Sequence, residues 1–132
     1  MNLEPRFELT STTGETFNKA GKTDILMRYE KRNVFVAECK FWSGKKNHFD
    51  TVDQLLSYLT WRDSKAAIVY FVPTKEMTAP LKAIHDSTPE HPAFIAAKGK
   101  RDESWFHYDF HLPGDRGRLV HVAILCFHLP RS

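Results

Sequence analysis

The chain has 132 residues and a net charge of +3, with 42% hydrophobic and 27% charged residues. This length corresponds to one domain, and the balance of apolar and charged residues excludes an intrinsically disordered chain. No apolar run approaches the ~18–20 residues that cross a membrane, the N-terminus lacks a secretory pattern, and the distant Cys39 and Cys126 favour a reduced, cytoplasmic compartment.

Local patterns in the first part of the chain predict strands. A short alternating stretch at residues 6–10 predicts one strand, while residues 1–23 hold no convincing helix. Alternation over residues 24–30 and a β-branched, aromatic run over residues 33–41 predict two more strands. A polar turn at Lys31-Arg32 would join these two strands as an antiparallel hairpin.

Two helices are expected around one buried strand. The first runs from Phe49 or Asp50 to Arg62 and is capped by Asp50 or Thr51; its apolar stripe consists of Val52, Leu55, Leu56 and Leu59. Residues 66–72 form a continuous apolar run that predicts a strand buried on both faces. A second helix is expected over residues 78–86, with Pro80 in its first turn.

The last third predicts a second hairpin. Residues 91–101 are ambiguous, whereas residues 104–112 and 118–129 alternate around a Pro- and Gly-containing turn. The resulting order of strands and helices predicts an α/β domain: one mixed β-sheet flanked by helices, with an added C-terminal β-hairpin.

One tempting motif is rejected. Gly21-Lys22-Thr23 resembles the end of a phosphate-binding P-loop, but the glycine required five residues earlier is replaced by Thr16. The triplet also leads into a predicted strand, where a P-loop would open a helix. Nucleotide hydrolysis of the P-loop type is therefore excluded.

Five polar residues form a candidate site. Asp24 opens one predicted strand, and Glu38 and Lys40 lie two apart on the next, so they share a face. Gln54 and Tyr58 lie four apart on the predicted helix and are neighbours there, outside the apolar stripe. Two ordinary alternatives stay open: a same-face ion pair on a solvent-facing strand, and helix rings, Tyr58 and Trp61, that cover a second buried face.

The order and spacing of these residues resemble a known family. Asp24, then Glu38-x-Lys40, then Gln54-x-x-x-Tyr58 is similar to the PD-(D/E)xK nuclease superfamily, which has the restriction-endonuclease-like fold. The Gln-x-x-x-Tyr element resembles that of its RecB-like branch. The match covers roughly half of the chain, and residues 1–132 would form a single domain of this kind, either alone or within a longer protein. Two features depart from the family: Thr23 stands where a proline is common, and an acidic first helix is missing.

The resemblance implies hydrolysis of phosphodiester bonds with the help of Mg²⁺ or Mn²⁺. Asp24 and Glu38 would bind the metal through their carboxylates, and the backbone carbonyl of Cys39 would be a third ligand, since Mg²⁺ prefers oxygen ligands. Lys40 would orient the attacking water and offset charge in the transition state. Gln54 would hold the water or a phosphate, and Tyr58 would support it.

The hairpin must satisfy one geometric condition for this scheme. Residues directly opposite each other in an antiparallel pair share a face. A two-residue turn at Lys31-Arg32 would pair Asp24 with Cys39 and place Asp24 on the wrong face. The metal site therefore requires an odd-length loop or a bulge.

Further residues are candidates for binding nucleic acid. Lys45 and Lys46 could contact phosphates, and Trp42 could stack on a base; a solvated loop and packing of Trp42 are the alternatives. In the second hairpin, three residues share a strand face and one lies opposite, which is compatible with a zinc site or with the wet face of a half-buried ribbon: His107, Asp109, His111 and His121.

The leading hypothesis is a metal-dependent nuclease, with DNA as the expected substrate. Two alternatives remain: a catalytically silent nucleic-acid-binding module that keeps the fold, and a regulatory domain fused to a sensor. A homodimer, or fusion to a further domain, would supply part of the substrate selection.

Overall fold

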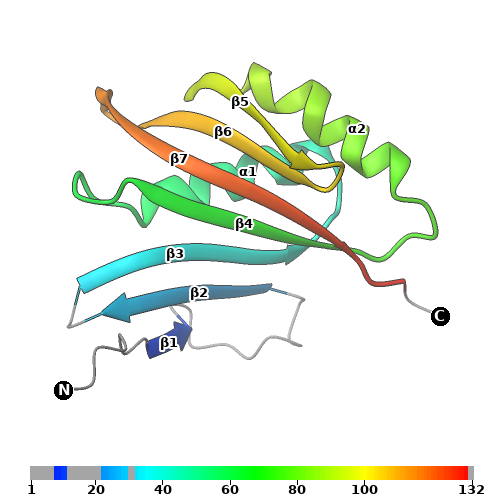
Figure 1. Ribbon diagram of the computed structural model, residues 1–132, viewed down its shortest axis with the longest axis horizontal. Helices are drawn as coiled ribbons and strands as arrows, with labels where there is room; N and C mark the ends of the chain where they lie inside the picture. The colour runs from blue at the N-terminus through cyan, green and yellow to red at the C-terminus, as the bar shows by residue number, and fades with distance from the viewer. Residues whose placement is uncertain (1–7, 12–21, 30–31, 131–132) are drawn as a thin grey trace.

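The computed structural model describes residues 8–11, 22–29 and 32–130, and it describes side chains for residues 36–130. In chain order the elements are β1 (Glu8–Ser11), β2 (Lys22–Tyr29), β3 (Arg32–Phe41), α1 (Lys45–Ser57), β4 (Lys65–Val72), α2 (Thr78–Ser87), the 3₁₀ turn η1 (Thr88–Glu90), β5 (Phe94–Asp102), β6 (Trp105–Leu112) and β7 (Asp115–His128) (Figure 1). None of the described helices is long and apolar enough to span a membrane.

The described strands form one mixed sheet in the order β1-β2-β3-β4-β7-β6-β5 (Figure 1). β4 pairs in parallel with both β3 and β7, and the other pairs are antiparallel. The predicted hairpins, β2–β3 and β6–β7, are confirmed. The predicted placement of Arg32 in the first turn was wrong, because Arg32 pairs with Tyr29 and begins β3. The domain is therefore α/β with a mixed sheet, as the order of elements predicted.

The main core lies between the two helices and one face of the sheet. Apolar side chains of α1 (Val52, Leu55 and Leu56) and α2 (Ile84) belong to one buried cluster with Val36 of β3 and with alternate residues of β4, β6 and β7. On β4 the intervening side chains Val69 and Phe71 are half-buried. The prediction that residues 66–72 are buried on both faces was therefore wrong in part, because both described helices pack on the same face.

The first helix begins earlier than predicted and ends earlier. α1 starts at Lys45, not at Phe49 or Asp50, and its N-cap is Gly44 at φ 108°, with no side-chain cap. Glycine enters this region of backbone space without a steric penalty, so the chain can turn sharply from β3 into the helix. Neither Asp50 nor Thr51 caps the helix; the Thr51 hydroxyl donates to the Asn47 carbonyl inside it.

The remaining predictions were close. β1 overlaps the strand predicted at residues 6–10, and α2 extends the predicted helix by one residue. The ambiguous segment 91–101 contributes β5. Cys39 and Cys126 are buried and form no disulfide. The sequence predicted no helix in residues 1–23, and most of this segment lies outside the described residues.

His48 connects α1 to β4 and to η1 through side-chain hydrogen bonds. Its Nδ1 contacts the Tyr70 hydroxyl of β4, and its Nε2 lies 2.9 Å from the Thr88 hydroxyl of η1. Thr88 donates its own proton to the Ile84 carbonyl, so it accepts from His48 Nε2–H. Tyr70 then donates its hydroxyl proton to His48 Nδ1. With His48 neutral, the Tyr70 hydroxyl, both ring nitrogens of His48 and the Thr88 hydroxyl all have hydrogen-bond partners.

His48 should make folding stability depend on pH. Burial, and then the nearby His91, lower the pKa of His48 from 6.5 to about 4. Between these two values the unfolded chain binds a proton that the folded chain does not, so stability falls as the pH is lowered through this window, by about 3 kcal/mol. The free energy of unfolding of His48→Gln, measured in urea at several pH values, should depend on pH less steeply than that of the parent. An equal pH dependence of the unfolding free energy in the two proteins would exclude His48 as its source.

Candidate functional site

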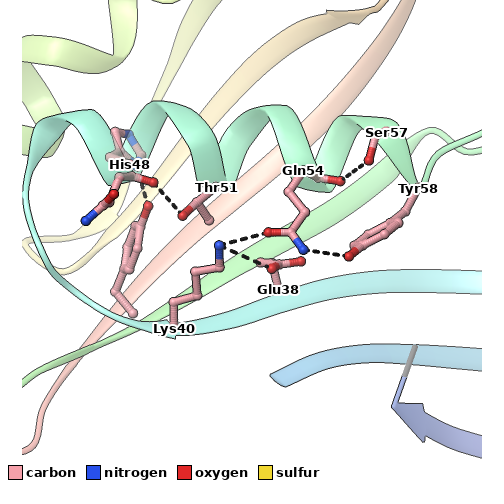
Figure 2. A network of polar contacts seen from close by, with 9 residues as sticks. Glu38, Lys40, His48, Thr51, Gln54, Ser57 and Tyr58 are labelled. Carbon is pink, nitrogen blue, oxygen red and sulfur yellow. Dashed lines mark hydrogen bonds and ion pairs between the residues drawn. The ribbon is translucent and has the colours of Figure 1, made fainter. Parts of the chain in front are cut away.

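Lys40 and Gln54 connect the sheet to α1. Lys40 Nζ, on β3, donates to Gln54 Oε1 at 2.9 Å, and Gln54 Nε2 donates to the Tyr58 hydroxyl at 2.7 Å. Figure 2 shows Lys40 rising from β3 toward the helix, with Gln54 and Tyr58 one turn apart above it. Because an ammonium group only donates, the amide oxygen of Gln54 must face Lys40, and its NH₂ group is left for Tyr58.

Glu38 lies beside Lys40 on the same strand. The Lys40 ammonium is 3.6 Å from Glu38 Oε1; the Glu38 side chain is 0% exposed and that of Lys40 is 15% exposed. The two carry opposite charges out of bulk water, where their attraction is stronger than at a surface. A solvent-facing ion pair, the ordinary alternative from the sequence, is therefore wrong for this pair.

The charge of Glu38 also reaches the neighbouring strand. Burial is the main cause that raises the pKa of Tyr70, and the Glu38 carboxylate adds to the same effect. The phenol of Tyr70 therefore stays protonated and remains a donor to His48. Tyr70 is thus influenced by the charge of Glu38 and forms a hydrogen bond with His48 of α1.

A β-bulge sets the position of Asp24. Tyr29 pairs with Arg32 and Arg28 with Asn33, and this register, continued unchanged, would put Asp24 opposite Ala37. The register shifts between Met27 and Arg28, so Asp24 lies opposite Glu38. The one-residue slip matters because it exchanges the two faces of a strand. The bulge that the metal site requires is present, although the Asp24 side chain lies outside the described ones.

The residues present fit a hard divalent cation on one condition. Directly opposite residues in an antiparallel pair have Cα atoms about 4.5–5.5 Å apart, so carboxylates at positions 24 and 38 can reach one ion that takes oxygen ligands. Among the side chains of residues 36–130, no three His, Cys, Asp or Glu are grouped for a metal. A metal held here therefore depends on Asp24.

The predicted third ligand meets a restriction. Cys39 lies opposite Thr23 of β2 and Val69 of β4, so β3 is paired on both sides at this point. The Cys39 carbonyl therefore lies inside the sheet and not on an open edge. This oxygen could ligate a metal only through its second lone pair.

The predicted nucleic-acid contacts are of two kinds. Lys45 and Lys46, in the first turn of α1, are exposed, and Lys45 forms an ion pair of 2.7 Å with Glu90. The Trp42 ring is half-buried, with ring centroids 5.2 Å from Tyr70 and 5.7 Å from His48. Trp42 packs against the core, which is the alternative that the sequence left open, and it is a poor platform for a base.

The second hairpin carries a histidine chain. His107 Nδ1 lies 3.0 Å from His121 Nε2, and His121 Nδ1 lies 2.9 Å from Asp109 Oδ1. His111 turns its Nδ1 to the Leu112 carbonyl. These side chains bond to one another in a row and do not converge on a common point, so the hairpin has the wet face of a half-buried ribbon and not a zinc site.

One polar cluster was missed from the sequence. Trp61 was placed on the helix, where it would cover a second buried face, but α1 ends at Ser57 and the Trp61 side chain is 62% exposed. Arg62 and Arg118 lie over its ring. Only the neighbouring Trp61-Arg62 pair is visible in the sequence, because Arg118 arrives from a distant strand.

Comparison with known proteins yields no relative. No family model, no curated protein and no solved structure matches the chain. Any function assigned to it therefore rests on its own residues and their geometry.

Proposed function

We propose that the chain is a metal-dependent nuclease of the restriction-endonuclease-like kind, which hydrolyses phosphodiester bonds, with DNA as the expected substrate. The observation that carries the proposal is the Lys40 ammonium, held 2.9 Å from Gln54 Oε1 and 3.6 Å from Glu38 Oε1. The register of Asp24 opposite Glu38 adds the second carboxylate position. The mixed sheet, with β3, α1 and β4 in sequence, supports the same fold.

The proposed roles follow from the chemistry of each side chain. Asp24 and Glu38 would hold Mg²⁺ or Mn²⁺, which when bound supplies Lewis acidity and a more acidic water. Lys40 would stabilise the negative charge that develops on the phosphate in the transition state. Gln54 is a positioning residue: it fixes the ammonium through one hydrogen bond, while Tyr58 fixes the amide of Gln54 through another.

Circular substrates provide the first test. The protein should convert circular single-stranded DNA and supercoiled plasmid to nicked or linear products in Mg²⁺ or Mn²⁺, and EDTA should stop the reaction. Gel electrophoresis detects the products, and cutting of a circle establishes endonuclease action. If linear DNA is degraded and circles are not, the same site acts as an exonuclease. No cleavage of any DNA or RNA with either metal would overturn the proposal.

A silent nucleic-acid-binding module is the second candidate. It is favoured by the complete burial of Glu38 and by the engagement of the Lys40 ammonium with Gln54. In this case the polar contacts would only join α1 to the sheet. Binding of oligonucleotides without cleavage, unchanged by Mg²⁺ and by Glu38→Gln, would favour the module over the enzyme.

A further inference from the structure

An exposed tryptophan stands at the end of the domain where α1 passes into β4. Trp61 is 62% exposed, more than any other large hydrophobic side chain among residues 36–130. Burying an indole ring normally contributes strongly to stability, so a ring left in water is uncommon. The exposure points to a role outside the core.

The loop that carries Trp61 is held in place. The Asp63 carboxylate accepts from the Thr60 backbone N–H at 2.7 Å, and the Asp63 N–H donates to the Thr60 carbonyl at 2.9 Å. The next residue, Ser64, accepts from the His121 N–H of β7 at 2.8 Å. Trp61 is therefore presented by an ordered turn beside the start of β7, and both lie at the same end of the sheet (Figure 1).

Two guanidinium groups lie against this ring. Arg62 Cζ is 5.0 Å and Arg118 Cζ is 5.9 Å from the ring centroid of Trp61. Within the described side chains neither arginine has a carboxylate at ion-pair distance, and Asp63 is engaged by its own turn. Arg118 Nε is buried and meets no acceptor in the described part of the chain. An aromatic surface and uncompensated positive charge thus occupy one place.

We infer that Trp61, Arg62 and Arg118 form a binding platform for single-stranded nucleic acid, in which an unpaired base stacks on the indole and the guanidiniums contact phosphates. Stacking of a base on an aromatic ring is stronger than an exposed cation–π contact. A base can therefore displace one guanidinium from the ring, and the displaced guanidinium then contacts the phosphate backbone of the nucleic acid. The inference rests on the proposed function for its choice of nucleic acid as ligand.

The platform lies close to the candidate nuclease site. Trp61 follows Tyr58 by three residues, so their Cα atoms are at most about 11 Å apart. Tyr58 is joined to Lys40 through Gln54, so a base on Trp61 would be separated by a short stretch of single strand from a phosphate bound at Lys40. The platform would thus select unpaired substrate. A protein partner could also cover Trp61, but two guanidiniums that have no carboxylate partner among the described side chains favour a phosphate-bearing ligand.

Binding without cleavage tests the inference. Fluorescence anisotropy of a labelled oligothymidylate is measured in EDTA, where no metal-dependent cleavage occurs. Trp61→Ala should weaken binding by about 5- to 150-fold, and Trp61→Phe, which keeps a ring, should recover most of the affinity. Arg62→Gln and Arg118→Gln should each lower the slope of log affinity against log salt by about 0.7. The matched control is Phe127→Ala: this ring is 50% exposed, and no guanidinium among the described side chains lies over it; the variant should bind like the parent.

Several outcomes would overturn the platform. Trp61→Ala could bind the oligonucleotide like the parent, or it could lose as much affinity for a blunt duplex as for the single strand. Phe127→Ala could lose as much affinity as Trp61→Ala. The parent could bind no oligonucleotide, which would leave a protein partner as the ligand of Trp61. Failure of the nuclease proposal looks different: the parent would bind the oligonucleotide through Trp61 but cleave nothing in Mg²⁺ or Mn²⁺. Cleavage with parent-like binding by Trp61→Ala would refute the platform alone.

Discussion

Glu38→Gln is expected to abolish metal-dependent cleavage. The substitution keeps the shape of the side chain and removes the negative charge that a divalent cation requires. Changes to residues that only orient a metal ligand already cost about 10–100-fold, so loss of a ligand should exceed about a hundredfold in kcat/KM. Cleavage of labelled DNA at saturating Mn²⁺ measures it. Glu76→Gln, on the exposed loop before α2, is the matched control and should cleave like the parent.

The glutamine variant is preferable to alanine because of the burial of Glu38. The carboxylate is 0% exposed beside Lys40, so alanine would leave a cavity as well as a lysine that has lost its carboxylate. Loss of activity in Glu38→Ala could then follow from partial unfolding. Urea unfolding should place Glu38→Gln closer to the parent than Glu38→Ala. A Glu38→Gln protein that cleaves at the parental rate would remove Glu38 from the metal site.

Local patterns predicted the elements whose residues alternate or recur along one helix face. The two hairpins and α2 were found because each carries its own signal over a short window. β5 was missed because most of its side chains are exposed and Gly99, at φ 100°, interrupts it. The start of α1 was missed because its first turn is polar and its cap is a glycine, so the apolar stripe begins only after it.

The site residues can also be divided into those that local patterns predict and those that they do not. Glu38 and Lys40 follow from the two-residue period of a strand, and Gln54 and Tyr58 from the i, i+4 spacing of a helix; the contact between Lys40 and Gln54 joins the two sets. The register of Asp24 was not predictable, because it depends on a single bulged residue that leaves no periodic trace. The contact of Trp61 with Arg118 was equally hidden, because the two meet only through the parallel pairing of β4 with β7.

Lys40 offers the sharpest separation of catalysis from structure. Lys40→Met would leave the buried Glu38 carboxylate without this ammonium, and breaking such a pair costs about 3–5 kcal/mol. Its loss of activity would therefore be ambiguous. Lys40→Arg keeps a positive charge and hydrogen-bond donors for Glu38 and Gln54, so its stability in urea should stay near that of the parent.

If Lys40 only neutralises Glu38, Lys40→Arg should cleave at the parental rate, as should Lys75→Arg, an exposed control. If Lys40 stabilises the transition state, arginine should fail, because its planar fork cannot place a compact charge at the point that Gln54 fixes for the ammonium, 2.9 Å from its Oε1. We expect kcat to fall on the order of 10²–10³-fold, as for the loss of one transition-state donor. Oligonucleotide affinity should be unchanged, which assigns the loss to the chemical step. Parental kcat in Lys40→Arg would instead limit Lys40 to pairing with Glu38, and the charge on the phosphate would need another partner.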